Sequence, residues 1–144
     1  PRAPTARERY ETTLEFAYRG PRELLSLAVP PLLLQPLVEN SLKHGCTPDP
    51  GPGPADGAPA GLHLELAAAR QDGFVELTFS DDGVAAPNGS AGLGVGLTNL
   101  EQRLRRFAGA GVTMEAGPRR AADGSPTPGF TVRLRWPVTE GATP

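Results

Sequence analysis

The sequence lacks several features that would place it in common classes of protein. It holds a single cysteine, Cys46, so no intramolecular disulfide can form. No apolar run approaches the roughly 20 residues that a membrane-spanning helix needs, and no signal peptide is visible. The net charge of −2 at pH 7 provides no basic field for nucleic acid. We therefore expect a cytoplasmic domain that does not bind nucleic acid.

The length of 144 residues fits one domain with a hydrophobic core. Because the chain begins with Pro1 instead of Met, we expect it to be a piece of a longer protein. Residues 46–61 are nearly all Pro, Gly, Ala and Asp, a composition typical of a flexible loop. We expect 1–8 to end an upstream linker helix, 9–137 to form the folded domain and 138–144 to be a tail.

The spacing of apolar residues predicts the order β–α–β–β–α–β–β. Spacings of three and four predict helices over 31–44 and 95–107, and Pro36 is expected to tighten or kink the first of them. A hairpin turn is expected at 71–73 and a polar loop at 119–129. Alternating apolar and polar residues predict a half-buried strand at 13–18 and further strands at 62–66, 74–79 and 130–136. A short strand is expected at 112–115. The order indicates an α/β (α+β) fold with helices on one face of a mixed, mostly antiparallel sheet.

Four polar residues share one arc of the first predicted helix, and apolar residues fill the other arc. These four are Glu39, Asn40, Lys43 and His44. Asn offers a neutral oxygen to Mg²⁺, Lys offers a charge to phosphate, and Glu can accept a proton. The alternative is an ordinary surface ion pair of Glu39 with Lys43, beside a His44 that favours the helix C-terminus.

A second group of residues follows the strand predicted at 74–79. Asp81-Asp82-Gly83 ends that strand, and the stretch Gly92-Leu93-Gly94-Val95-Gly96 opens the second helix. Glycines at a helix N-terminus let backbone N–H groups approach an anion, and a carboxylate at a strand end can accept a hydrogen bond from an amine such as that of adenine. The alternative is a loop in which glycines and aspartates form turns. The spacing is neither a Rossmann fingerprint nor a Walker P-loop.

Together, in this order, the two groups resemble the LytS-type sensor histidine kinases. Residues 30–45 (PPLLLQPLVENSLKHG) resemble the N-box of that family, 81–83 its first glycine box and 92–97 its second. The resemblance covers roughly 9–137. It implies the ATP-binding catalytic domain of the GHKL superfamily, with a Bergerat-type two-layer sandwich.

The resemblance also implies roles for individual residues. Asn40 would coordinate Mg²⁺, and Lys43 and His44 would lie near the phosphates of ATP. Glu39 would assist the reacting groups as a base, so that Glu39 and Lys43 are the candidate catalytic residues. The remaining nucleotide-binding candidates are Asp81 for the adenine amino group, Gly83 beside the base, and Gly92, Leu93, Gly94, Val95, Gly96 and Leu97 at the lid hinge and phosphates.

Such a kinase transfers the γ-phosphoryl group of ATP to a histidine in an upstream dimerisation segment. His44 belongs to the N-box and His63 to a predicted strand, so neither lies in an acceptor motif. We therefore expect that this chain alone does not autophosphorylate. The implied partners are the upstream histidine segment, a response regulator and a second copy in a full-length homodimer, whose parent chain we expect to be membrane-anchored.

The sequence departs from the family pattern at two positions. Ala85 replaces the second glycine of the first box, and Asp82 stands where Asn is common, which adds a negative charge near the nucleotide. These departures keep open a catalytically degenerate module that binds nucleotide or only partners. A serine kinase of the anti-sigma type, from the same superfamily, is the other alternative.

Overall fold

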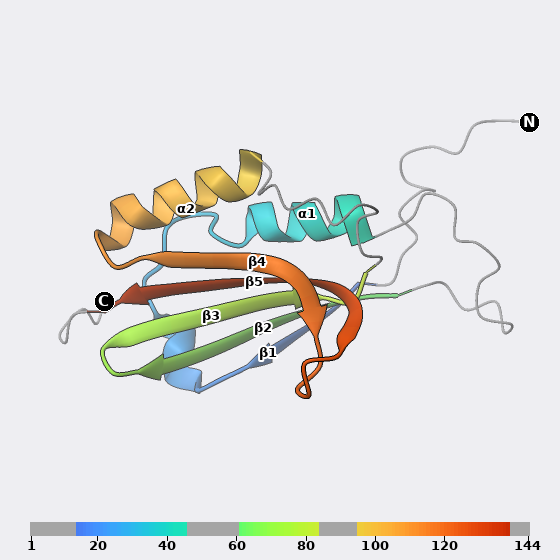
Figure 1. The fold of residues 1–144 in the computed structure, drawn as a ribbon. Helices are drawn as coiled ribbons and strands as arrows, with labels where there is room; N and C mark the ends of the chain where they lie inside the picture. Colours follow the sequence, from blue (N-terminus) through green and yellow to red (C-terminus); the bar gives the residue numbers. More distant parts are fainter. Residues whose placement is uncertain (1–13, 46–60, 84–94, 139–144) are drawn as a thin grey trace, which may run out of the picture.

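The computed structural model describes residues 14–45, 61–83 and 95–138. The chain forms a sheet covered by two α-helices (Figure 1). Within the described residues, no helix has the length and apolar character needed to cross a membrane. In chain order the elements are β1 (Leu14–Arg19), the 3-10 helix η2 (Arg22–Ser26), α1 (Gln35–Gly45), β2 (Leu62–Gln71), β3 (Phe74–Asp81), α2 (Val95–Ala108), β4 (Thr113–Arg120) and β5 (Pro126–Pro137).

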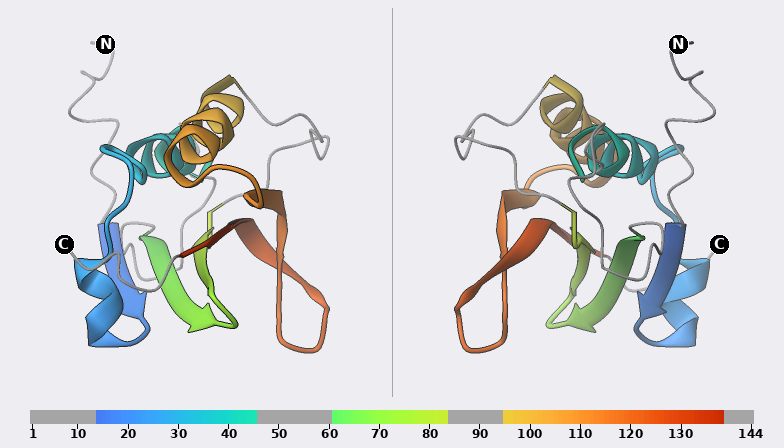
Figure 2. Two further views of the ribbon diagram at one scale, coloured as in Figure 1. Left: turned by 90° about the vertical axis from the view of Figure 1, so that its left-hand side faces the viewer. Right: turned by 90° about the vertical axis from the view of Figure 1, so that its right-hand side faces the viewer.

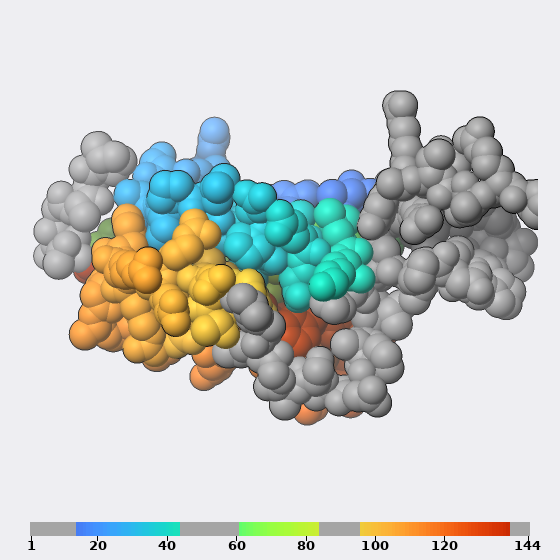
Figure 3. Space-filling view, turned by 90° about the horizontal axis from the view of Figure 1, so that it is seen from above, coloured from blue at the N-terminus to red at the C-terminus, as the bar shows by residue number. Residues whose placement is uncertain are grey.

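The five strands form one mixed sheet in the order β1-β2-β3-β5-β4. β1 pairs with β2 in parallel, and every other neighbouring pair is antiparallel. Both α-helices lie on the same face (Figure 2), side by side when viewed from above (Figure 3). The predicted fold class is confirmed: helices cover one face of a mixed, mostly antiparallel sheet.

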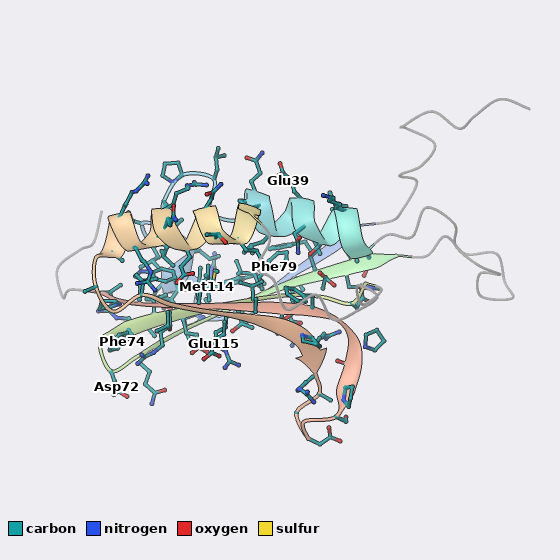
Figure 4. The ribbon with its side chains drawn as sticks, turned by 45° about the horizontal axis from the view of Figure 1, so that its top comes forward. Glu39, Asp72, Phe74, Phe79, Met114 and Glu115 are labelled. Carbon is teal, nitrogen blue, oxygen red and sulfur yellow. The ribbon has the colours of Figure 1, made fainter. Side chains whose placement is uncertain are left out.

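Strict alternation along the central strands builds the core. Successive side chains of a strand point to opposite faces of the sheet, and every second residue of β3 is buried. Figure 4 shows Phe79 between the sheet and the helices. Trp136 of β5 and Leu100 of α2 are 1% and 0% exposed. The other buried apolar residues are Leu33, Leu37, Leu62, Leu64, Ala68, Val75, Leu77, Leu97, Leu104, Val112, Val132 and Leu134.

The β2–β3 hairpin turns at Asp72-Gly73, as the sequence predicted. Both residues have positive φ, 53° and 78°, which is the geometry of a two-residue type I′ turn. This turn fixes the register in which Gln71 faces Phe74 and Leu64 faces Asp81. The hairpin thereby determines where β3 ends and on which face its last side chain lies.

Helix α1 begins at Gln35, later than the predicted start at 31. Its first backbone bond runs from the N–H of Val38 to the carbonyl of Leu34. Pro36 therefore falls in the first turn, where its missing N–H leaves no helical hydrogen bond unmade. The preceding segment is tied to α2, because the guanidinium of Arg103 donates to the carbonyl of Pro31.

Two sequence-based predictions about the strands are wrong. Most of the predicted loop 119–129 belongs to a long hairpin, since β4 runs to Arg120 and β5 starts at Pro126. Strand pairing across this hairpin overrides the low strand propensity of its prolines and glycines. Strand β1 was expected to be half-buried, but Leu14 and Phe16 are 48% and 55% exposed. They share the helix-facing side with Leu62 and Leu64, yet β1 is an edge strand and α1 does not cover it (Figure 2).

Gly129 of β5 lies where only glycine fits. Its φ is 116°, and a Cβ atom added there would lie 1.8 Å from the carbonyl oxygen of Asp81. We expect the substitution Gly129→Ala to lower the free energy of unfolding by about 3 kcal/mol or more, because it combines backbone strain with a steric clash. Urea denaturation followed by circular dichroism measures this loss.

Gly117 of the paired strand β4 provides a matched control. A Cβ atom at Gly117 meets nothing within 4 Å, so Gly117→Ala should change the stability by less than about 0.5 kcal/mol. Equal effects of the two substitutions would contradict the close approach of Gly129 to Asp81.

Candidate functional site

A buried carboxylate marks the end of the central strand β3. Asp81 is the last residue of that strand, and the alternation of β3 turns its side chain toward the helices. It is 6% exposed, and it and Ser41 are the buried polar residues among the described positions. A buried charged group is costly unless hydrogen bonds replace its water, so the surroundings of Asp81 must provide donors.

Three donors from different segments satisfy this carboxylate. The hydroxyl of Ser41 in α1 donates to Oδ2 over 2.6 Å. The backbone N–H groups of Gly83 and Phe130 donate to Oδ1 over 3.1 and 3.3 Å. The bond from Gly83 is a local turn of the kind that aspartates form, whereas the other two bonds cross the fold. Asp81 therefore shapes a turn and also joins α1, β3 and β5.

The polar residues that the sequence places on one arc of α1 differ in their exposure to solvent. Glu39 and Lys43 are exposed and Asn40 is half-buried; Figure 4 shows Glu39 pointing away from the sheet. Glu39 accepts a hydrogen bond of 2.8 Å from the side-chain amide of Gln35. The described ion pairs do not include one between Glu39 and Lys43, so the alternative of a surface pair is not realised. His44 lies in α1, and its side chain falls outside the described residues.

The glycine-rich positions are only partly described. Gly83 lies two residues after Asp81 and is buried, and its backbone N–H donates to Oδ1 of that aspartate. Helix α2 begins at Val95, Gly96 is exposed in its first turn, and the side chain of Leu97 is 5% exposed in the core. Leu97 could therefore meet a ligand only through its backbone. The predicted positions Gly92, Leu93, Gly94 and Ala85 lie outside the described residues.

Asp82 turns to the opposite face of the sheet. Its Oδ1 accepts the backbone N–H of His63, and its Oδ2 lies 2.7 Å from Nδ1 of the same residue. The other ring nitrogen, Nε2, lies 2.9 Å from a carboxylate oxygen of Glu15. Both oxygens of Asp82, the residue at which the sequence adds a negative charge, are thus engaged by His63. The hydrogen bond that the imidazole donates to Asp82, followed by the negative charge of Asp82, raises the pKa of His63 above its usual value of 6.5.

Two hollows lie on this open face of the sheet. The larger, of about 510 Å³, is lined by β2, β3 and the β4–β5 hairpin, including Arg119 and Arg133. The smaller, of about 240 Å³, is lined by β1 and β2 and reaches Asp81. Figure 2 shows the β4–β5 hairpin curving away from the helices, which makes this face concave. Neither lining includes a residue of α1.

Sequence reasoning missed two partners of Asp81. Helical periodicity places Ser41 among the apolar residues of α1. A polar side chain at such a position is a signal that it has a buried hydrogen-bonding partner. Phe130 contributes its backbone N–H, which carries no signal in the sequence. Only the tertiary structure brings these groups to the end of β3.

Comparison with known proteins gives structural similarity without a sequence match. No protein-family model and no curated protein matches the chain. The histidine kinase domain of the blue-light activated histidine kinase from Erythrobacter litoralis EL346 superposes with a TM-score of 0.53 at 16% identity, covering 89% of this chain and 56% of that one. The catalytic domain of histidine kinase ThkA superposes with a TM-score of 0.52 at 11% identity, covering 86% and 79%.

These similarities establish the fold. The chain has the α/β fold of histidine kinase catalytic domains. It spans just over half of the Erythrobacter litoralis kinase domain, at 56% of its length. At 16% and 11% identity the shared fold does not by itself assign a function, so the function must be argued from the site.

The contact between His63 and Asp82 predicts a pH-dependent contribution to stability. Because Asp82 raises the pKa of His63 in the folded chain, the stabilisation is fully present below the unfolded value near 6.5 and is lost as the pH rises through the folded pKa. An NMR titration of the imidazole should show a pKa above 6.5 that falls in the variant Asp82→Asn.

Glu15→Gln is the matched control for this titration. Glu15 contributes less to the shift than Asp82 does, so its removal should lower the pKa of His63 by a smaller amount. The variant His63→Gln identifies the resonance, since the chain holds two histidines. A pKa of His63 that is unchanged in Asp82→Asn would contradict the contact.

Proposed function

We propose that this chain is the ATP- and Mg²⁺-binding catalytic domain of a sensor histidine kinase of the LytS type. One observation carries the proposal: Ser41 of α1 and Asp81 of β3 are hydrogen-bonded over 2.6 Å. This bond brings the stretch that resembles an N-box against the residue that opens the first glycine box. The fold, shared with histidine kinase catalytic domains, agrees with this arrangement.

Asp81 would recognise the base of the nucleotide. A buried carboxylate accepts hydrogen bonds and donates none when ionised. Adenine offers an exocyclic amine, whereas guanine offers a carbonyl oxygen at the same position. An acceptor at this point therefore favours adenine. Gly83, buried directly beside Asp81, allows the chain to pass close to the base.

The phosphates of ATP would bind between α1 and the start of α2. Lys43 is exposed on α1 and provides a mobile positive charge. The N-terminus of α2, at Val95 and Gly96, presents backbone N–H groups that have no acceptor within the helix, and it is the positive end of the helix dipole. The proposed phosphate-binding residues also include Gly92, Leu93, Gly94 and Leu97, each through its backbone. His44, which lies on the same helix as Lys43, is the last member of this group.

The residues present fit an Mg²⁺ ion that is held mainly by the nucleotide. Mg²⁺ keeps several waters and takes few protein ligands beside phosphate oxygens. The described residues contain no cluster of three or more His, Cys, Asp or Glu that could hold a metal alone. Asn40 is half-buried on α1 and offers one neutral oxygen. When bound, the ion would neutralise the charge on the phosphates.

The proposed reaction transfers the γ-phosphoryl group to a histidine of an upstream segment. The neutral imidazole nitrogen attacks phosphorus, the bond to the bridging oxygen of ADP breaks, and the imidazole proton leaves. Glu39 is exposed on α1 and can accept that proton from an incoming histidine. A response regulator would then receive the group. In the full-length protein we propose a homodimer whose parent chain anchors the domain at the cytoplasmic side of a membrane.

Binding of ATP should depend on Asp81. We expect calorimetric titration to show ATP binding that strengthens with Mg²⁺ and weakens about 10- to 100-fold in Asp81→Asn, because a hydrogen bond to a charged acceptor contributes about 1.5–3 kcal/mol. The matched control is Asp82→Asn, which removes the same charge one residue away on the side of His63. Equal losses in both variants, or no binding at millimolar ATP, would refute the proposed site.

Phosphotransfer should depend on Asn40. With the full-length protein and labelled ATP, we expect an acid-labile, base-stable phosphohistidine, which Asn40→Ala reduces about a hundredfold. Gln102→Ala, an exposed change on α2, should leave labelling unchanged, and the 144-residue chain alone should remain unlabelled. Acid-stable phosphoserine on a partner would instead indicate a serine kinase, and ATP binding without any phosphorylation would indicate a degenerate module.

A further inference from the structure

Ser41 is a polar residue on the buried side of a helix whose proposed functional residues face elsewhere. Its relative exposure is 2%, and none of the roles proposed above belongs to it. The distance of 2.6 Å from its Oγ to Oδ2 of Asp81 is in the range of charge-assisted O–H···O⁻ bonds. Such bonds are about twice as strong as those between neutral groups.

Counting the acceptor positions of Asp81 shows what this bond does. An ionised carboxylate has about four lone-pair positions, two on each oxygen. The N–H groups of Gly83 and Phe130 occupy both positions on Oδ1. Ser41 occupies one position on Oδ2. Among the donors of the described residues, one acceptor position therefore stays open, and it lies on Oδ2 beside Ser41.

We propose that Ser41 is a positioning residue that orients the Asp81 carboxylate toward the exocyclic amine of the bound base. The inference rests on the proposed function, since it assumes that Asp81 binds adenine. The terminal torsion of an aspartate side chain has a broad, roughly two-fold distribution of values. The backbone donors to Oδ1 alone would therefore leave the direction of Oδ2 loosely defined. The hydroxyl of Ser41 fixes Oδ2 and leaves it one acceptor position for one amine hydrogen.

This role differs from a purely structural contact because it is selective for the base. A residue that only stabilises the end of β3 would affect every nucleotide equally. A residue that orients Oδ2 affects only nucleotides that donate to Oδ2. Purine riboside triphosphate, which lacks the amine at position 6, provides the discriminating ligand.

The test measures the affinity of Ser41→Ala for ATP and for purine riboside triphosphate by calorimetry. We expect ATP affinity to fall about tenfold, the size of one hydrogen bond to a charged group. Affinity for purine riboside triphosphate should change less than about twofold. The matched control is Ser80→Ala, since Ser80 precedes Asp81 but contacts Thr131 over 3.2 Å; it should change neither affinity.

A double-mutant cycle with Asp81→Asn separates the two proposals. In the Asp81→Asn background, Ser41→Ala should cause no further loss of ATP affinity. Should Ser41→Ala fail to fold, Ser41→Cys keeps nearly the same volume with a weak S–H donor, and the same selective loss is expected.

Equal losses for both ligands, or no loss for ATP, would overturn the role of Ser41 while leaving the ATP site intact. A wild-type chain that binds ATP independently of Asp81 would overturn the proposed site and the role of Ser41 together.

Discussion

The need to satisfy the buried charge of Asp81 links the main parts of this fold. An ionised carboxylate that is 6% exposed must gain from the protein the hydrogen bonds that it loses from water. Its donors come from α1, from the turn after β3 and from β5. The N–H of Phe130 can reach it only because Gly129 lets β5 approach the backbone of Asp81. The positions of helix, strand end and neighbouring strand are therefore mutually dependent.

Two consecutive aspartates serve opposite faces of the sheet. Strand alternation sends neighbouring side chains to opposite sides, so Asp81 points toward α1 and Asp82 toward His63. The imidazole of His63, flanked also by Glu15, contacts Oδ2 of Asp82 on the open face of the sheet. The two carboxylates therefore have different partners and lie on opposite sides of the sheet. The contacts of His63 also tie the edge strand β1 and its neighbour β2 to the end of β3.

Much of the fold follows from local pattern, and the errors have physical causes. Alternation and helical spacing located all five strands and both α-helices, and the Asp72-Gly73 turn set the central register. The hairpin around 121–125 was missed because Pro126 and neighbouring glycines have low strand propensity, which pairing with β4 overrides. The exposure of Phe16 could not be predicted, since alternation defines a face but not whether another element covers it.

In the candidate site, too, local sequence patterns indicated some residues, and others became evident only from tertiary contacts. The motifs singled out Asp81 and Asn40, whereas Ser41 was hidden because helical periodicity places it with the apolar residues. Ser41 donates to the buried carboxylate, whereas Glu39 and Lys43 face solvent on the opposite side of α1. Under the proposed function, base recognition and phosphate chemistry are thus fixed by one rigid helix. A displacement of α1 would disturb both at once, so ATP could not bind productively unless this helix is in place.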